Sequence, residues 1–581
     1  MPINFSIINQ FIERIAKQRI FLLILGMSFF SSVSGQAVFE NVQNSIYDYL
    51  NRQAQNGYIT LDDMIKPLTR NQISTYLSVL SEARKNKTAA LNEIEIKELE
   101  FYIKEYGTGV NDGYVNTAKE KWLGKDNRGR YRFFSKIDTS TITSNVKREI
   151  SQPFQFNLEP VLQGSLHADN KGKSLVYRTT GIQFWASLGK RFGLQMYYRD
   201  INENGTGIDF DKQFTPEQGV VPTANPKSQA LNYADVRASM TYQWKNGMLA
   251  FGKEQYLGGY GLNGNIIYST KAPSYPYLRL NQQIFPWLKF EYTHAFLASR
   301  LVDTPNSYRT TNYGVFGGQR FKMIPKYMVS HALSFNLKKG LDLMLGESVI
   351  YTDKIQLGYW LPMMFYKAWD QYVSGTNLNA GANTQLFAQI SSRNQIKHTH
   401  LYASMLVDEF RPSAIFDPKR SRNQLAFNIG GSVTNIPYLP YVTINLDYTR
   451  INPFVYQNLL PAQEYTNNGY VMGDWMGSNA DRIVYEVKYT PIPRMKISVR
   501  YEKIRKGAKG SAEQQYFQEP QPEFLFELQQ KQWNTSAKVV YEWIHNLYFY
   551  VHFQSNEIKK YGAVFSTKRY SNISAGFSMG W

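Results

Sequence analysis

Apolar and polar side chains alternate strictly through the last ten residues of the chain. Ile573, Ala575, Phe577, Met579 and Trp581 share one parity, and small polar residues or glycines occupy the positions between them. Because successive side chains of a β-strand point to opposite faces, this period of two predicts a strand with one apolar and one polar face.

The same alternation recurs through most of the chain, in segments that include 398–407, 424–431, 442–448, 496–502 and 546–553. Their polar face often carries full charges, which a small closed sandwich could not bury but a wide, wet lumen can accept. About 18 candidate strands of roughly ten residues fit between Tyr131 and Trp581, and a tilted membrane-crossing strand needs that length. We therefore predict an all-β transmembrane barrel of about 18 antiparallel strands over residues 111–581. The terminal aromatic residue resembles the usual end of bacterial outer-membrane barrels.

The connections between these strands differ in length. Short connectors predict periplasmic turns, and long polar stretches predict outer loops. The predicted turns are 189–190, 245–247 and 338–340, and the predicted outer loops include 202–228 and 506–530. Rings near strand ends, among them Trp185, Tyr256 and Trp543, are expected at the membrane interfaces.

A different period marks residues 36–110, where apolar positions recur at helical spacing. Thr69 with Gln72, and Asn92 with Glu95, have the spacing of capping boxes, and Gly57 is placed to end a first helix. We expect three short helices in a bundle that packs on the barrel, because so small a module is marginally stable alone. Nothing in it indicates catalysis, and a plug, dock or lid is the expected role.

The first 35 residues have the order of a secretory signal peptide. Arg14, Lys17 and Arg19 precede an apolar run over 20–30, and small residues follow over 31–35. The run is shorter than the ~20 residues of a membrane-spanning helix, which disfavours the alternative of a membrane anchor. We predict export, with cleavage near Gly35.

Composition narrows the possible chemistry. The 581 residues contain no cysteine, which excludes a disulfide scaffold, a thiolate zinc site, an iron–sulfur cluster and a cysteine nucleophile. The formal net charge is +19 and 15% of residues are aromatic. A basic excess suits lipid phosphates at the rim or an acidic polysaccharide. Nucleic acid is not an expected partner, because the alternation assigns most of the chain to lipid.

Three stretches resemble the Wzi-like capsule assembly family of outer-membrane proteins. They are 251–269 with its glycine-rich turn, 400–410 with its acid pair followed by Phe, and the helical segment 47–70. The resemblance extends over nearly the whole mature chain, although its motifs are loose. It implies an 18-stranded barrel with a helical bundle at the periplasmic end, and a role in holding or assembling surface polysaccharide.

Three motifs that could indicate other chemistry have simpler interpretations. Gly259, Gly261 and Gly264 have dinucleotide-motif spacing, but strand-like residues follow where a helix is required, so a tight turn against the barrel is expected. His398 and His400 lack further ligands nearby, and we expect no metal. No catalytic motif appears, and we expect neither an enzyme nor a cofactor.

The sequence thus predicts an outer-membrane barrel that binds, anchors or helps assemble surface polysaccharide, expected to be acidic. A channel for anionic solutes or oligosaccharides is the alternative, and a surface hydrolase would need two converging acids. Outer-membrane lipid and a protein partner through the helical bundle are the other expected partners. The candidate polysaccharide-binding residues, taken from the polar parts of the resemblance, are Lys253, Glu254, Tyr260, Asp408, Glu409 and Arg411.

Overall fold

The structure is a computed structural model, and it describes most of the chain after residue 36. The described residues are 37–107, 121–125, 131–138, 154–189, 191–223, 229–309, 318–377, 381–409, 417, 423–562 and 564–580. The predicted signal peptide, Arg411 and Trp581 lie outside them.

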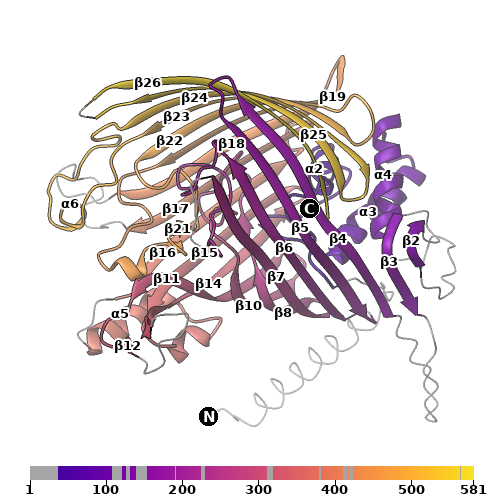
Figure 1. The fold of residues 1–581 in the computed structure, drawn as a ribbon. Coiled ribbons are helices and arrows are strands. Elements are labelled where there is room, and N and C mark those ends of the chain that lie inside the picture. Colours follow the sequence, from indigo (N-terminus) through magenta and orange to yellow (C-terminus); the bar gives the residue numbers. More distant parts are fainter. Residues whose placement is uncertain are drawn as a thin grey trace, which may run out of the picture.

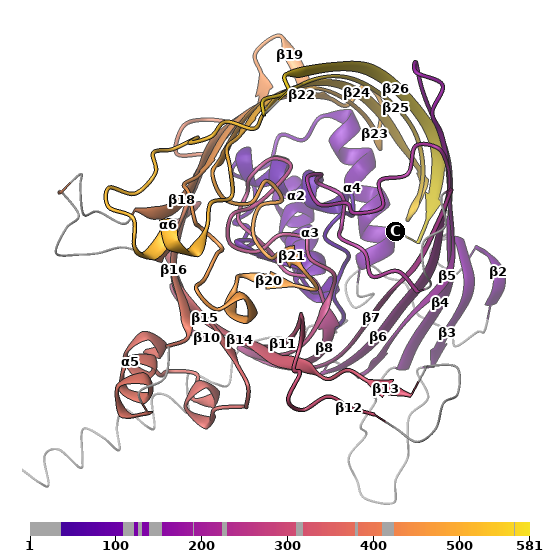
Figure 2. The same ribbon diagram turned by 60° about the vertical axis from the view of Figure 1, so that its left-hand side comes forward.

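Eighteen antiparallel strands close into a barrel, as predicted (Figures 1 and 2). The last strand pairs with the first, with Met579 opposite Leu162. A hairpin of β2 (Lys121–Lys125) and β3 (Tyr131–Asp138) extends the sheet beside the start of β4. The barrel strands are β4 (Phe154–Asp169), β5 (Ser174–Leu188), β6 (Phe192–Gly205), β7 (Ala230–Trp244), β8 (Gly247–Glu254), β10 (Tyr275–Phe285), β11 (Leu288–Val302), β14 (Met323–Lys338), β15 (Leu341–Thr352), β16 (Asn383–Arg393), β17 (Thr399–Glu409), β18 (Gln424–Ile436), β19 (Leu439–Ile451), β22 (Ala480–Tyr489), β23 (Met495–Lys506), β24 (Gln530–Ile544), β25 (Leu547–Lys560) and β26 (Ser566–Met579).

Side chains alternate between the two sides of the barrel wall as the pattern predicts. On β26, Ile573 and Phe577 are exposed on the outer surface, whereas Ser574 and Ser578 are buried on the inner one. The same parity gives the other strands an apolar outer surface, which is the arrangement that lipid outside and polar groups inside require.

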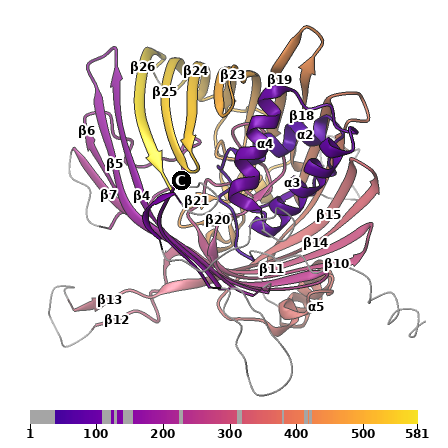
Figure 3. The same cartoon turned by 90° about the vertical axis from the view of Figure 1, so that its right-hand side faces the viewer.

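Three helices form a bundle at one end of the barrel (Figure 3). They are α2 (Ile46–Gln55), α3 (Arg70–Lys85) and α4 (Glu93–Tyr106), and the capping boxes predicted at Thr69 and Asn92 are both present. Their apolar faces share one core, which includes Leu50, Leu77 and Leu99. None of the described helices is long and apolar enough to cross a membrane.

The bundle occupies the barrel end at which the strand connections are short. Predicted turns join β5 to β6, β7 to β8, and β14 to β15 at this end, and the bundle contacts neighbouring turns. The long connections, including 507–529 with α6 (Ala512–Tyr516), lie at the other end. Since short turns face the periplasm in outer-membrane barrels, the bundle lies on the periplasmic side.

Two long connections from the outer end fold back into the lumen and fill much of it. The first runs over 255–274 with β9 (Leu257–Gly258), and the second over 452–479 with η3 (Pro461–Gln463), β20 (Thr466–Asn467) and β21 (Tyr470–Val471). Hydroxyls of Tyr456 and Tyr465 donate to the carbonyls of Ile266 and Ile267 at 2.6 and 2.9 Å. The first loop also reaches the bundle, where β9 pairs with β1 (Ile65–Lys66). We call these two loops the lumen plug.

Candidate functional site

The first candidate cluster holds the base of the lumen plug. Lys253 Nζ donates to the carbonyl of Val236 and to Ser274 Oγ, both at 2.7 Å. Glu254, buried beside it, forms an ion pair with Arg237 at 3.4 Å. Both residues therefore fix the point at which the first inward loop leaves β8.

Tyr260 lies further along the same loop, at the contact between plug and bundle. Its hydroxyl donates to Asp63 Oδ1 at 2.9 Å, and its ring lies against the guanidinium of Arg393 at 4.8 Å. Arg393 also pairs with Asp63 at 2.8 Å. Burial would raise the pKa of Asp63, but Arg393 and Lys66 outweigh it and hold that pKa well below its usual range. The carboxylate is thus charged and ties the bundle to the barrel.

The second candidate cluster divides between two roles. Asp408 accepts from Gln385 Nε2 at 2.9 Å and from the backbone N–H of Tyr456 at 2.6 Å, so it anchors the second inward loop. Glu409 accepts from Gln424 Nε2 at 3.5 Å at the outer end of the barrel. These adjacent acids do not converge on one ligand, as strand alternation predicts.

The glycine-rich motif forms the predicted tight turn. A Cβ on Gly261 would lie 2.3 Å from the carbonyl oxygen of Gly264, and one on Gly264 would lie 2.4 Å from Asp474 Oδ2. Asp474 is paired with Arg482 at 2.9 Å, and both side chains are fully buried. The glycines therefore bring the two inward loops and the wall into contact.

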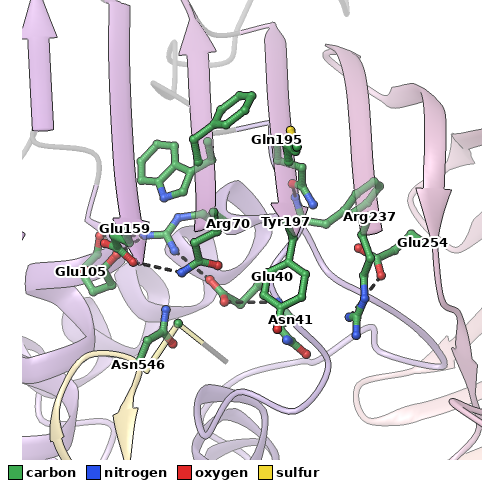
Figure 4. A pocket seen from close by; sticks show the side chains of 16 residues that line it. Glu40, Asn41, Arg70, Glu105, Glu159, Gln195, Tyr197, Arg237, Glu254 and Asn546 are labelled. Carbon is green, nitrogen blue, oxygen red and sulfur yellow. Dashed lines mark hydrogen bonds and ion pairs between the residues drawn. The ribbon is translucent and has the colours of Figure 1, made fainter. Parts of the chain in front are cut away.

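A cleft opens between the bundle and the inner wall of β4–β8 (Figure 4). Glu254 lines it, but its aromatic faces are covered: Arg70 lies 4.7 Å from the ring of Trp185, and Arg237 lies 5.2 Å from that of Tyr197. Arg70 also pairs with Glu40 at 2.8 Å. This cleft is the joint between bundle and wall, and its rings are not available to stack on a ligand.

Two of the rings expected at the membrane interfaces point into the barrel instead, and that prediction was wrong for them. Trp185 faces Arg70, and Tyr256 is 4% exposed beneath the guanidinium of Arg279. Trp543, by contrast, is 57% exposed next to a short turn, as expected. Position near a strand end does not reveal which face a ring takes when cations inside the barrel provide a partner.

An open groove at the outer end of the barrel brings together polar and aromatic side chains that are not among the candidate residues. The guanidinium of Arg450 lies 3.9 Å from the ring centre of Phe524, and Arg450 Nε donates to Asn452 Oδ1 at 3.0 Å. The sequence feature that could have indicated this groove is Phe524, an aromatic residue inside the polar stretch 506–530 that is predicted as an outer loop. We call this surface the outer groove; it is lined by Asn423, Arg450, Asn452, Pro453, Gln521, Pro522 and Phe524.

A second polar surface lies on the inner wall away from the plug. Lys538 is opposite His552, His552 is opposite Ser574, and Ser574 is opposite His167, so the four form one row across four strands. The row has the inward parity, since the neighbouring Ile573 is exposed on the outside. Within the residues that the structure describes, neither Lys538 nor His552 is in an ion pair with a carboxylate. We call these four residues the lumen row.

A closed barrel with an apolar exterior, a polar interior and long outer loops defines an outer-membrane β-barrel protein. The profile of the family described as capsule assembly protein Wzi matches residues 224–556. The chain belongs to this Wzi capsule assembly family and is an outer-membrane protein.

Solved structures also match this chain. Wzi of Escherichia coli, described as a carbohydrate-binding β-barrel involved in group 1 capsule assembly, is 10% identical, with a TM-score of 0.54. The match covers 94% of this chain and 99% of that one. OccK3 of Pseudomonas aeruginosa is 13% identical over 73% of this chain and 95% of its own, with a TM-score of 0.37. No curated protein matches this sequence.

Proposed function

We propose that this protein binds surface polysaccharide at its outer face and anchors or helps assemble it, without catalysing a reaction. The family assignment supports a role in capsule assembly, and the E. coli structure of similar fold is described as carbohydrate-binding. The observation that carries the proposal in this chain is the outer groove, which places a guanidinium, amides and an aromatic ring together at the exposed end of the barrel.

The chemistry of the outer groove suits an oligosaccharide. Sugar hydroxyls need both donors and acceptors, which the amides of Asn423, Asn452 and Gln521 supply. The guanidinium of Arg450 offers paired donors to a carboxylate or a vicinal diol, and the ring of Phe524 orients it. Glu409, one of the candidate residues, accepts from Gln424, which directly follows Asn423 of the groove in the chain.

An acidic polymer is the proposed ligand class. The lumen row presents Lys538, His552 and His167 on one inner surface, and Arg500 of β23 lies two residues closer to the outer end, opposite Ser536. Arg500 is ion-paired with Glu486 at 2.7 Å, whereas Lys538 is in no ion pair with a carboxylate among the described residues. Lys538 and Arg450 would favour carboxylates or phosphates on the polysaccharide.

The filled lumen favours binding over transport. The lumen plug joins the bundle through β1 and β9, and the buried pair of Arg482 and Asp474 closes its centre. An open anion channel is the second candidate, and planar-bilayer conductance distinguishes the two. We expect the purified barrel to show almost no conductance. A steady, anion-selective current would instead favour the channel.

A hydrolase is disfavoured because at least three of the four glutamates that line the cleft are in ion pairs. Glu40 and Glu105 pair with Arg70, and Glu254 pairs with Arg237, whereas a glycosidase needs one carboxyl kept protonated and another free. We expect no release of reducing ends when the purified protein is incubated with the host polysaccharide. A protein partner for the bundle in the periplasm stays a prediction.

The deciding experiment compares cell-bound with released polysaccharide in a deletion strain. Complementation with the wild-type chain should restore the cell-bound fraction, and Arg450→Gln with Phe524→Ala should not. Losing charge-assisted contacts of about 1.5–3 kcal/mol lowers affinity at least about tenfold. Arg569→Gln is the charge-matched control, because it removes an arginine of β26 that is not part of the outer groove and that pairs with Glu557 of β25 at 2.8 Å. Polymer that stays cell-bound without the protein would contradict the proposal.

A further inference from the structure

Part of the chain packs against the outside of the barrel wall. Residues 353–377, which include η1 (Leu357–Trp360) and α5 (Tyr366–Asn377), leave the outer end of β15 and lie outside the ring of strands (Figure 2). We call this segment the outer arm. Tyr359 and Tyr366 of the arm share an apolar cluster with Phe290, Val329 and Val349 of the wall.

The wall beneath the arm is not apolar throughout. Tyr292 of β11 is opposite His331 of β14, and His331 is opposite Glu347 of β15, so three polar groups form a row across the strands. Glu347 shares its parity with Leu345, which is 46% exposed on the outer surface. This row therefore faces the lipid side.

The depth of the row places it inside the apolar belt. Glu347 lies seven positions after Gly340 of the short turn, which corresponds to a height of about 18 Å on a tilted strand. The apolar belt of such barrels is about 25 Å tall. Without a cover, a carboxylate and an imidazole would meet acyl chains at this height.

The outer arm supplies a hydrogen-bond partner to each member of this row. The carboxylate of Glu347 accepts the N–H groups of Tyr366 at 2.6 Å and Lys367 at 3.4 Å, which begin α5. His331 Nδ1 donates to the carbonyl of Pro362 at 2.8 Å, and its Nε2 lies 3.1 Å from Glu347. A helix start has unpaired N–H groups, and membrane depth tolerates no unpaired backbone, so the wall and the arm satisfy each other.

The opposite face of the outer arm is apolar and exposed. It is continuous with the exposed side chains of the barrel belt, such as Leu345, that face lipid in any outer-membrane barrel. The exposed fractions are 81% for Leu357, 54% for Leu361, 72% for Met363, 57% for Phe365 and 66% for Tyr372.

We propose that the outer arm is embedded in the outer leaflet, with lipid acyl chains contacting its apolar face. The polar groups of the arm that face the wall are hydrogen-bonded there, and the exposed apolar side chains face surroundings that at this depth are hydrocarbon. The arm thereby covers the polar row and separates it from the lipid that the rest of the apolar belt contacts. This inference is independent of the proposed polysaccharide binding.

Single-cysteine labelling tests the proposal cleanly, because the chain contains no cysteine. Met363→Cys, carrying an environment-sensitive fluorophore, is reconstituted as the full chain in vesicles with or without phospholipids brominated along the acyl chain. We expect quenching similar to that of labelled Leu345→Cys on the belt. Labelled Phe517→Cys, 76% exposed in an outer loop, is the aqueous control and should not be quenched.

Two outcomes would overturn the proposal. One is a Met363 probe that behaves like the Phe517 probe and is quenched by aqueous iodide. The other is a probe shielded from both quenchers with energy transfer between differently labelled copies, which would assign the face to a second copy of the chain. Glu347→Leu should release the start of α5 and reduce lipid quenching at Met363 at least twofold, with the heat-modifiable band showing that the barrel is folded. Unchanged quenching in that variant would remove Glu347 as the tether.

Discussion

The contact between Arg393 and Asp63 is expected to hold the bundle in the barrel. Both residues are 3% exposed, and the guanidinium also donates to the carbonyl of Leu61 and to Asn51 Oδ1, each at 3.2 Å. In Arg393→Met the stem remains but all of these donors are lost. We expect this substitution to loosen residues 51–66 without opening the barrel, because the strand ladders do not depend on it.

The expected loss of stability follows from the Asp63 carboxylate, which stays buried when Arg393 is replaced. Removing one partner of a buried ion pair costs about 3–5 kcal/mol, because the other charge stays buried. Lys66 remains 3.2 Å from Asp63, so the lower end, about 3 kcal/mol, is expected. That loss would accelerate amide exchange through bundle opening about 100-fold.

The assay is hydrogen exchange of α2 and α3 amides in the full chain in lipid nanodiscs, with β24 amides as an internal reference. Lys397→Met is the matched control, because it removes the same charge from an exposed position of the same turn. Asp63→Asn combined with Arg393→Met should cost much less than the sum of the single changes. Bundle amides that exchange at the wild-type rate in Arg393→Met would refute the reasoning.

The other predictions concern the same contacts and the lumen plug. Tyr260→Phe removes the 2.9 Å hydrogen bond to Asp63, and the exchange of bundle amides should rise about tenfold for a loss of ~1.5 kcal/mol; an unchanged rate would mean that the ring alone holds the contact. Because the pKa of Asp63 is lowered in the folded state, its contribution is complete above the unfolded value of about 4 and declines as the pH falls below it. Bundle exchange, corrected for intrinsic rates, should therefore accelerate below about pH 4 in the wild type and much less in Asp63→Asn. Gly264→Ala would place a Cβ 2.4 Å from Asp474 Oδ2, so we expect a displaced plug and bilayer conductance above the wild-type level, with Gly562→Ala, which meets nothing within 4 Å, as the control.

The sequence predicted features whose causes are local or repeat along the chain. A capping box needs only Thr69 and Gln72 on one helical turn, and it formed as expected. The barrel was predictable because every strand must satisfy lipid on one side and polar groups on the other, so Ile573 and Ser574 carry the same signal as every other strand.

The candidate residues that the structure describes lie at strand ends and turns, as expected, but partners of several come from far along the chain. Asp408 binds the backbone of Tyr456, and Tyr260 binds Asp63, which precedes it by almost two hundred residues. No local pattern encodes such contacts. These residues therefore proved to hold the plug and the bundle, and Arg411 keeps its status as a prediction because it lies outside the described residues.

The sequence by itself determined the barrel and the helical bundle, because alternation, helical period and caps act within a few residues. The export signal stays a prediction. Only the tertiary structure decided which loops enter the lumen, that Arg450 stacks on Phe524, and that Glu347 faces outward beneath a helix that it caps. The physical reason is that burial and charge pairing are properties of neighbours in space, and a closed barrel makes neighbours of segments that are distant in sequence.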